Sequence, residues 1–527
     1  MSGLIVFGLI ALVYLFDLGG APVYFGGDEA HFAVVGKSIA TTGRNLNGDF
    51  MPLFFNLADP AADLTPLPWG NTWYQPLLFY LVAIILKVAP MNEFTVRLPT
   101  AIIGGIITPI LVYLVAHRLF KRRGLALFGA VVLALTPPQL ILSRQALDYV
   151  CPLPFVLGWL WFLIDYTETR RLKSVAIGAV CLGLGFYSYI ASWVMMPIYL
   201  ALSLIVFWRA GGAWLRPMLV AAASFCLPVL VFLPWLWFHP AMLKETFDRY
   251  QMSDQEQTSM IQEPANAFRR DKVAATLTTY WSHFDPGFLF LVGGPSMTTS
   301  TGRVGVFLLP LVVLLPLGII VLIRRPDPYG FNTLILLGIV TAPIAATLKG
   351  QPFTIQRVLF MLPFASLVAA VGFDWLWQQR YRAARAVAIV LAVGLVLQFG
   401  VFYRDFFTHY PLRSAFYYDP EAFEDIAEYM MADKTAPLIF FSDELDDVGA
   451  KWRYYTSRDG RSDLIGRTRY VHNDGLDIGP SDAGSLLAVH TKTTEMAALE
   501  AGGMWKKEKI IADVDHRDTV AIFRKLR

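Results

Sequence analysis

Charged residues are scarce in this chain of 527 residues, because Asp, Glu, Lys and Arg together make up only 16% of it. An ordinary soluble domain contains about 25% charged and about 45–50% apolar residues. Here 55% of the residues are hydrophobic, and the mean hydropathy is +0.49. These values exclude an ordinary soluble protein and favour an integral membrane protein. The net charge of +3 gives no indication of a nucleic-acid partner, and we predict none.

Cysteine is also rare. The three cysteines, Cys151, Cys181 and Cys226, lie in or beside apolar segments, which excludes a disulfide framework and a CxxC metal site. We predict no metal site built on cysteine, and we name no metal ligand among the site residues. No Walker loop, no GxGxxG motif after a strand, and no HExxH or GxSxG motif occurs in a suitable context. These absences argue against a nucleotide-driven pump and against a soluble type of nucleotide-sugar enzyme.

Apolar stretches long enough to cross a hydrocarbon core of about 30 Å recur along the chain. The first, Gly3–Phe16, lacks a basic leader and a small-residue cleavage site, so we expect a retained span rather than a removed signal peptide. We predict spans at Gly3–Gly19, Leu98–Phe120, Leu125–Leu142, Leu153–Tyr166, Ser174–Ile190, Val194–Trp208, Met218–Phe238, Gly305–Ile323, Leu334–Leu348, Val358–Trp377 and Ala384–Phe402.

Pro76–Val88 is a further apolar segment, but it is short and contains Lys87. A run of about 10–14 apolar residues is more typical of an interfacial or buried helix than of a span. If this segment does not cross, the main basic connections all lie on the cytoplasmic side, as the positive-inside rule requires. We therefore predict eleven spans, with the N-terminus inside and the C-terminus outside. The basic connections are Lys121–Arg123, Arg170–Lys173, Arg209–Arg216, Arg324–Arg325 and Arg380–Arg385.

This topology predicts three large segments outside: residues 20–97 with interfacial helices, residues 239–304, and the tail 403–527. Residues 1–402 form a transmembrane domain, and the fold is mainly α, a polytopic helix bundle with a small C-terminal α/β domain. In the tail, the pattern predicts a helix at Pro420–Ala432 and strands at Pro437–Phe441, Ser485–Val489 and Thr519–Phe523.

The segment Phe25–Phe32, directly after the first span, has two adjacent carboxylates behind two glycines that allow a sharp turn. From Asp28 onward, the apolar residues are spaced for an amphipathic helix. Such a helix would hold Asp28 and Glu29 in its first turn, where the helix dipole stabilises negative charge. The segment is either an acidic functional site at the membrane surface or a solvated helix start, since Asp is a common capping residue.

A short outside loop contains Arg144 and Asp148, which are four residues apart and would share one face of a helical turn. They form either an interfacial ion pair or part of a cleft that also receives Asp28 and Glu29. Two acidic sites on neighbouring outside loops are able to converge on a single cleft.

A third outside loop, Lys349–Arg357, carries cations against the positive-inside trend, and misplaced charge near membrane depth is a functional hypothesis by default. Arg357 suits phosphate recognition because its planar fork donates paired hydrogen bonds. The alternative is that these side chains snorkel to lipid headgroups. The aromatic segment Tyr280–Phe290 is typical of a membrane interface or a lid, and its His283 fits a structural role better than a catalytic one.

Over residues 1–400 these motifs, in this order, resemble the lipid-linked-sugar glycosyltransferases of the GT-C fold. The chain is most similar to the branch of protein O-mannosyltransferases and aminoarabinose transferases. One departure is Gln75, which precedes Pro76 where many relatives carry a second proline or a basic residue, so the lysine near the donor phosphate of some relatives has no clear counterpart. The matching elements are Asp28-Glu29, Trp73–Phe79, Arg97-Leu-Pro, Ser143-Arg144 with Asp148, His283–Phe290, and Arg357 with the following Leu-Pro.

The resemblance implies transfer of a sugar from a polyprenyl-phosphate donor to an acceptor hydroxyl, with inversion at the anomeric carbon. Asp28 would be the general base, and Glu29 and Asp148 would orient the acceptor or stabilise charge on the sugar. Arg357, with Arg144, would offset the charge of the departing phosphate. The substrate-binding residues that we predict are His31, Tyr74, Arg144, Tyr149, His283, Lys349, Gln356 and Arg357.

No cofactor follows from the resemblance, although Asp28, Glu29 and Asp148 are chemically able to bind a divalent cation. We expect a monomer in the bacterial plasma membrane, with a periplasmic tail and a glycolipid or protein acceptor. The main alternative is a secondary transporter of a lipid-linked or small polar substrate. Transporters favour internal repeats and midplane charges, whereas these ionisable residues cluster at one interface and no repeat is evident.

Overall fold

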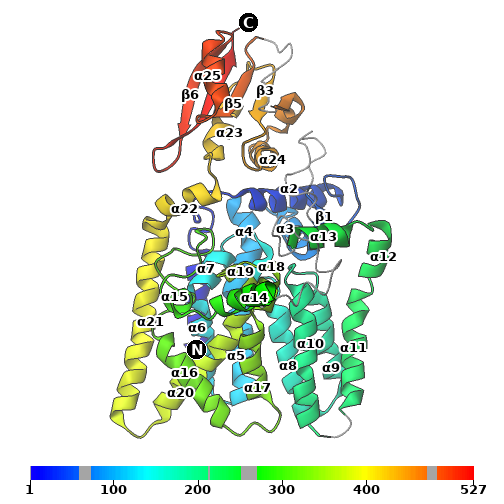
Figure 1. Ribbon diagram of the computed structural model, residues 1–527, viewed down its shortest axis with the longest axis vertical. Helices are drawn as coiled ribbons and strands as arrows, with labels where there is room; N and C mark the ends of the chain where they lie inside the picture. The colour runs from blue at the N-terminus through cyan, green and yellow to red at the C-terminus, as the bar shows by residue number, and fades with distance from the viewer. Residues whose placement is uncertain (1, 58–72, 212–213, 251–269, 472–482, 527) are drawn as a thin grey trace. The chain divides into compact units, whose positions relative to one another are not determined.

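The computed structural model describes residues 2–57, 73–211, 214–250, 270–471 and 483–526 (Figure 1). The chain forms two compact units. The first contains Met1–Phe16, Trp73–Leu77 and Thr100–Phe406, and the second contains Asp17–Thr72, Leu78–Pro99 and Phe407–Arg527. The second unit therefore combines the tail with most of the first large loop.

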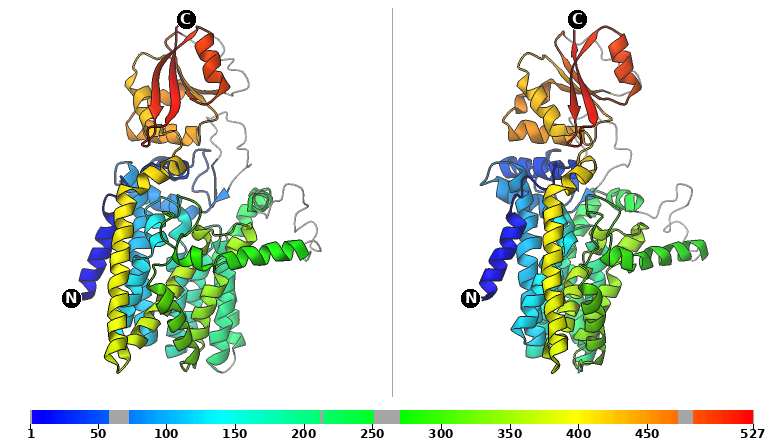
Figure 2. Two further views of the ribbon diagram at one scale, coloured as in Figure 1. Left: turned by 60° about the vertical axis from the view of Figure 1, so that its left-hand side comes forward. Right: turned by 90° about the vertical axis from the view of Figure 1, so that its left-hand side faces the viewer.

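The first unit is a bundle of helices that stand side by side (Figures 1 and 2). A chain region this apolar forms helices because in lipid every backbone polar group must find its partner within the protein. The elements are α1 (Ser2–Leu15), π-helix η1 (Ile103–Ile107), α5 (Thr108–Phe120), α6 (Arg123–Ala134), α7 (Pro137–Ser143), 3₁₀-helix η2 (Asp148–Val150), α8 (Leu153–Thr169), α9 (Leu172–Gly185), α10 (Ser192–Arg209), α11 (Leu215–Val229), α12 (Phe232–Phe238), α13 (Met242–Tyr250), α14 (Arg270–Ser282), α15 (Pro286–Phe290), α16 (Leu311–Arg324), α17 (Phe331–Thr341), α18 (Ile344–Lys349), α19 (Ile355–Val358), α20 (Met361–Gln378) and α21 (Arg382–Thr408).

Within the described residues, six helical stretches are long and apolar enough to cross a membrane, and a bent pair makes up to seven. The six are Glu93–Phe120, Asp148–Thr169, Ser192–Arg209, Leu215–Phe238, Phe331–Lys349 and Arg382–Thr408. Shorter apolar helices lie at Gly3–Leu15, Pro76–Leu86, Leu172–Gly185 and Leu311–Arg324. Each predicted span contains a helix, although the helix predicted from Gly305 begins only at Leu311.

The prediction of one continuous span over Leu125–Leu142 is wrong. Helices α6 and α7 are bent by 61° at a break between them. Thr136 at the break has an extended backbone, with φ −78° and ψ 122°, and two prolines follow it. The residue before a proline is disfavoured in helical conformation, and a proline ring clashes with the preceding helical turn. The break therefore follows from Pro137 and Pro138.

Close helix packing in the bundle depends on glycine at the crossing of α16 and α20. A Cβ atom at Gly318 would lie 2.0 Å from the Val368 carbonyl oxygen, and one at Gly372 would lie 2.3 Å from the Leu314 carbonyl oxygen. Small residues let helix backbones approach closely where lipid provides no hydrophobic driving force between helices. A larger side chain at either position would separate the two helices.

The second unit contains a five-stranded sheet in the order β4-β3-β5-β7-β6. Strand β3 runs parallel to β4 and β5, and β7 runs antiparallel to β5 and β6. The elements of this unit and its joins are α2 (Gly27–Thr42), β1 (Phe55–Asn56), β2 (Trp73–Tyr74), α3 (Pro76–Leu86), α4 (Glu93–Ile102), α22 (Tyr410–Tyr418), α23 (Phe423–Ala432), β3 (Ile439–Ser442), α24 (Val448–Arg458), 3₁₀-helix η4 (Ser462–Arg467), β4 (Thr468–Val471), β5 (Leu486–His490), α25 (Thr494–Ala501), β6 (Trp505–Ala512) and β7 (Asp518–Lys525).

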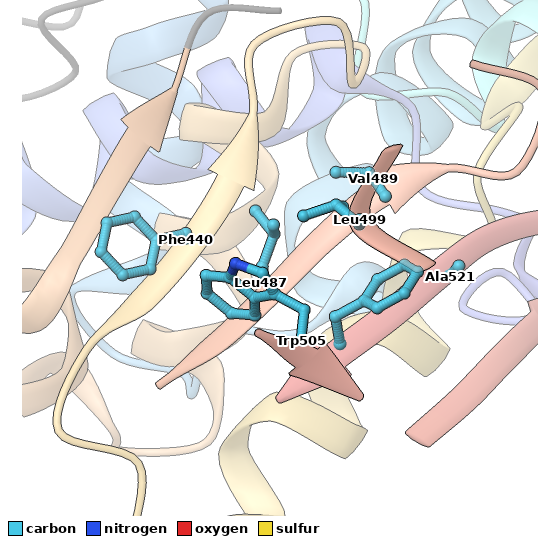
Figure 3. Close-up of a cluster of buried hydrophobic side chains, with 7 residues drawn as sticks. Phe440, Leu487, Val489, Leu499, Trp505 and Ala521 are labelled. Carbon is cyan, nitrogen blue, oxygen red and sulfur yellow. The ribbon is translucent and has the colours of Figure 1, made fainter. Parts of the chain in front are cut away.

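A hydrophobic cluster on one face of this sheet forms the core of the tail (Figure 3). Leu487 of β5 and Phe523 of β7 are fully buried, and Leu499 of α25 packs against them. The cluster consists of Phe440, Leu487, Val489, Leu499, Trp505, Ala521 and Phe523. The predicted mainly α fold with a small C-terminal α/β domain is confirmed.

The helix and the three strands predicted in the tail are present as α23, β3, β5 and β7. The prediction missed β4 and β6. Strand β6 has the sequence WKKEKIIA and lies at the edge of the sheet, with most of its side chains exposed. Lysines are typical of edge strands because they discourage pairing with another chain, but they also hide the alternating pattern of a strand.

Candidate active site

Helix α2 begins at Gly27, directly after the first apolar helix, as the amphipathic pattern predicts. Phe32, Val35 and Ile39 are buried along one face. The Gly26 N–H donates to the Glu29 carboxylate at 3.2 Å, which satisfies one of the free donors at the helix start. Two carboxylates thus occupy the first turn, where the helix dipole favours negative charge.

The Glu29 carboxylate is fully engaged by one buried cation, Arg97. Arg97 Nε donates to Oε1 and Nη2 donates to Oε2, both at 2.8 Å. The side-chain exposed fractions are 0% for Arg97 and 3% for Glu29. Arg97 also donates to the carbonyl oxygens of Leu18, Gly19, Pro22 and Tyr24 at 2.8–3.4 Å. One guanidinium therefore fixes the chain turn that leads into α2.

Asp28 has the opposite environment. It is exposed in the first turn of α2, next to the buried Glu29. Because Asp28 is exposed, an incoming molecule can reach its carboxylate, whereas Glu29 is enclosed. No feature of the sequence indicates which of the two carboxylates is exposed.

The tail approaches α2 through Asp447, at the start of α24. The His31 Nε2 atom lies 3.4 Å from Asp447 Oδ1. A Cβ atom on Gly27 would lie 2.0 Å from Asp447 Oδ2, so only glycine fits there without a shift of the aspartate. Asp447 itself has a left-handed backbone with φ 46°. The sequence analysis did not identify Asp447, since nothing local links residues 31 and 447.

A second buried cation in this unit, Lys451 of α24, was also not predicted. Its Nζ atom contacts Asp419 Oδ1 at 2.9 Å, Glu421 Oε2 at 3.2 Å and Asp446 Oδ2 at 3.5 Å. His490 Nε2 lies 3.4 Å from Glu421 Oε1. Burial lowers the pKa of Lys451, but Asp419 and Glu421 outweigh it and raise the pKa above its ordinary value. This lysine cluster holds the segment between α22 and α23 against α24.

The turn after α7 differs from the predicted helical turn. Residues 144–147 are not helical, so the predicted i,i+4 geometry of Arg144 and Asp148 is wrong. Arg144 is fully buried, and its Nη1 donates to the Tyr14 carbonyl oxygen at 2.9 Å. Asp148 is buried at the start of η2, and the Tyr149 ring packs edge-on against Tyr189 at a centroid distance of 5.4 Å. These residues are enclosed in the first unit.

His283 is fully buried and links the end of α14 to the segment before α19. Its Nδ1 lies 2.9 Å from the Thr279 carbonyl oxygen, and its Nε2 accepts from the Thr354 N–H at 3.3 Å. This pattern requires a neutral ring with the proton on Nδ1, because Nε2 is an acceptor. Burial lowers the pKa of His283, which also favours the neutral form. The contacts favour a structural role.

The remaining predicted residues are half-buried. Lys349 is the last residue of α18, and Gln356 and Arg357 belong to the short helix α19. Tyr74 lies in β2. Within the described part of the chain, no group of three or more His, Cys, Asp or Glu side chains has the geometry to hold a metal ion.

The chain is similar to one protein family and to several solved structures. Residues 73–238 match the family model described as dolichyl-phosphate-mannose-protein mannosyltransferase. No curated protein sequence matches the chain. The fold is similar to that of ArnT from Cupriavidus metallidurans bound to undecaprenyl phosphate, with a TM-score of 0.60 and 13% identity over 99% of this chain and 98% of ArnT. The chain has the GT-C fold.

A second GT-C structure, the oligosaccharyltransferase AglB from Archaeoglobus fulgidus in complex with an inhibitory peptide and a dolichol-phosphate, is also similar. The TM-score is 0.54 at 15% identity, over 87% of this chain and 64% of AglB. The family match and the fold together confirm the resemblance to glycosyltransferases of the GT-C type and an integral membrane protein. The family match includes Arg97, Arg144 and Asp148 but begins after Asp28, so the roles of the individual residues stay predictions.

Proposed function

We propose that the chain is a membrane glycosyltransferase that moves a sugar from a polyprenyl-phosphate donor to an acceptor hydroxyl on the extracytoplasmic face. The GT-C fold and the family match over residues 73–238 support the reaction class. ArnT was solved with undecaprenyl phosphate and AglB with a dolichol-phosphate, which supports a donor of that lipid class.

The observation that carries the proposal is the different environment of two neighbouring carboxylates, Asp28 and Glu29. The buried Arg97 engages both oxygens of Glu29 and so fixes the start of α2. Asp28, in the same turn, is exposed. A sugar or protein hydroxyl is a weak nucleophile, so a carboxylate within hydrogen-bond reach must take its proton as the new bond forms. Asp28 has that role, and Glu29 is a positioning residue.

The proposed step is a single displacement. The acceptor oxygen bonds to the anomeric carbon while its proton passes to the Asp28 carboxylate. The bond from that carbon to the phosphate oxygen breaks, and polyprenyl phosphate leaves with the electron pair. Attack from the side opposite the phosphate inverts the configuration. Cationic groups must offset the charge that collects on the leaving phosphate.

The candidates for that phosphate contact are Lys349, at the end of α18, and Arg357, in α19. Both side chains are only half-buried. Arg144 is less suited because it is fully buried and donates to the Tyr14 carbonyl oxygen. Asp148, Tyr149, Tyr74, Gln356 and His31 keep their proposed substrate-binding or orienting roles on the strength of the resemblance.

The proposed acceptor is a glycolipid or a protein hydroxyl in a bacterial envelope, with the protein in the plasma membrane, its tail in the periplasm, and a monomer as the working form. Residues 1–402 form the catalytic domain of this proposal, and residues 403–527 form the extracytoplasmic domain.

The test is mass analysis of envelope lipids and proteins from cells with and without the gene. We expect one sugar to be missing from one pool when the gene is removed, and the gene carried on a plasmid to restore it. A lipid-linked sugar that accumulates at the same time would identify the donor. If both pools keep every sugar, the enzyme proposal fails. A transporter would change the distribution of a small molecule without removing a covalently attached sugar.

A further inference from the structure

A half-open hollow of about 420 Å³ lies in the first unit, at the turn between α5 and α6. It is lined by Arg122, Arg123 and Gly124 on one side and by Phe373, Asp374 and Trp377 of α20 on the other. The volume is within the range of small-molecule sites, which is about 300–1,000 Å³. The arginines belong to a basic connection that the sequence places on the cytoplasmic side, so the hollow is separate from the proposed reaction site.

The side chains of this hollow have an excess of positive charge, which favours an anion. Arg122 Nη1 is paired with Asp374 Oδ2 at 2.9 Å. The neighbouring Lys121 is turned to another partner, Glu168, at 2.9 Å. Arg123 is exposed, and in the described part of the chain its side chain makes no ion pair or hydrogen bond. Among the residues that line the hollow, two guanidinium groups face one carboxylate, and Arg325 also interacts with that carboxylate. The resulting excess of positive charge suits a phosphodiester.

The backbone adds donors to the same wall. Helix α6 starts at Arg123, and its N-cap residue Arg122 supplies no side-chain cap. The first N–H groups of a helix lack intrahelical partners, and together with the helix dipole they favour an anion. Gly124 lines the hollow, and a Cβ atom there would meet open space. An anion can therefore approach the backbone at this helix start.

Apart from Asp374, the opposite wall is aromatic and partly open. Trp377 is 46% exposed, and Phe373 lies beside it on α20. Tryptophan is enriched at the level of lipid headgroups, and basic pockets between transmembrane helices on the cytoplasmic side bind anionic lipid headgroups. From the cavity, its net charge, the uncapped helix and the aromatic wall, we infer that this hollow binds the phosphate group of an anionic membrane lipid.

The test uses the purified full-length protein and native mass spectrometry with phosphatidylglycerol or phosphatidylcholine of identical acyl chains. We expect wild-type protein to retain phosphatidylglycerol preferentially. The double variant Arg122→Gln/Arg123→Gln should lose this preference by roughly 20-fold, since it removes the hydrogen bonds of two cations to a charged phosphate.

The matched control is Arg382→Gln/Arg385→Gln, which removes two exposed positive charges at the start of α21 without touching the hollow. This variant should keep the preference within about twofold, because attraction to a diffuse surface charge is not what binds the lipid. An equal loss in both double variants would overturn the inference.

Two further experiments test whether the loss of binding comes from a folding defect and whether the ligand is free phosphate instead of a lipid. Gly124→Leu fills open space and keeps every charge, so it should reduce phosphatidylglycerol retention at an unchanged unfolding midpoint. Unchanged retention in this variant would contradict the site. Inorganic phosphate at millimolar concentration should not displace the lipid. If it does so as well as short-chain phosphatidylglycerol, the hollow is a site for free phosphate and the lipid assignment is wrong.

Discussion

Two fully buried cations organise the second unit, and they are neutralised in different ways. Arg97, near the start of α2, faces one carboxylate, Glu29, and its other donors go to backbone carbonyl oxygens. Lys451, in α24, faces the buried carboxylates Asp419 and Glu421 and the more exposed Asp446. The first arrangement balances charge one to one, and the second has an excess of negative charge.

The two sites differ in their response to pH. Arg97 keeps its proton, whereas the cluster around Lys451 contains groups with shifted pKa values. Arginine does not lose its proton in proteins, so Arg97 stays charged beside Glu29 across the physiological range. In the lysine cluster, burial raises the pKa of Glu421 above its ordinary value. The hydrogen bond to Glu421 raises the pKa of His490. The start of α2, which carries Asp28, is thus anchored by a cation that keeps its charge.

The largest expected effect on stability comes from breaking the fixed pair. Glu29→Gln leaves Arg97 charged and buried with no carboxylate, and breaking one partner of a buried ion pair costs about 3–5 kcal/mol. The free energy of unfolding, measured by denaturant titration of the purified protein, should fall by that amount. Glu424→Gln, which removes a carboxylate that is 42% exposed beside Arg458, is the matched control. An equal loss in both variants would contradict the anchoring role.

Removing the buried lysine of the second cluster should lower the free energy of unfolding nearly as much, but only at high pH. Lys451→Met leaves Asp419 and Glu421 buried without a cation, which costs about 3 kcal/mol at pH 8. At pH 5 the cost should shrink, because the pKa of Glu421 is already raised and the variant can take up a proton there. Denaturant titrations at the two pH values check this. A loss that is the same at both pH values would show that Glu421 does not take up a proton in the variant.

A smaller loss of stability is expected from a change at the contact between α2 and the tail, and a second substitution should reverse most of it. Gly27→Ala would place a methyl group 2.0 Å from the present position of Asp447 Oδ2. Overpacking of this kind costs about 1–3 kcal/mol. The double variant Gly27→Ala/Asp447→Ala should recover most of that loss in thermal unfolding. If the double variant is as unstable as the two single losses added together, the close approach is not what limits residue 27.

The smallest effect concerns pH. The pKa of His490 is raised in the folded state, so its contribution is fully present below its ordinary value of 6.5 and is lost as the pH rises through the raised value. Unfolding free energy should therefore decline above pH 6.5 by up to about 1 kcal/mol, the scale of a partly exposed ion pair. The variant His490→Gln should flatten this decline. A wild-type stability that rises over the same range would contradict the assigned pKa shift.

Much of the architecture could be predicted from the sequence, since membrane helices are set by local apolar length. The helix that carries Asp28 and Glu29 was also predictable, from its glycines and its apolar spacing. The prolines at the break between α6 and α7 indicate a helix end, but the hydropathy on both sides is continuous and predicts a single span. The pairing of Glu29 with Arg97 could not be predicted, because the two residues lie in separate segments and only tertiary packing brings them together.

Lys451 shows the same limit in the tail. A lysine in a helix with several charged and polar residues is normally solvated, and no local signal shows that α24 turns it toward Asp419 and Glu421. Exposure was likewise unpredictable for Asp28 and Glu29, which are neighbours in the sequence. Burial depends on which other segment covers each residue, and that information is spread over the whole chain.

The direct test of the central claim is the rate of sugar transfer by purified Asp28→Asn protein, with Asp49→Asn, another exposed carboxylate of the first loop, as its control. Loss of a general base lowers turnover by about 10²–10⁴-fold, while removing one charge from a helix start changes stability by less than about 1 kcal/mol. We predict that Asp28→Asn is folded and has lost at least about 100-fold in turnover, and that Asp49→Asn matches wild type. Asp28→Asn protein that transfers sugar within twofold of the wild-type rate would contradict the account.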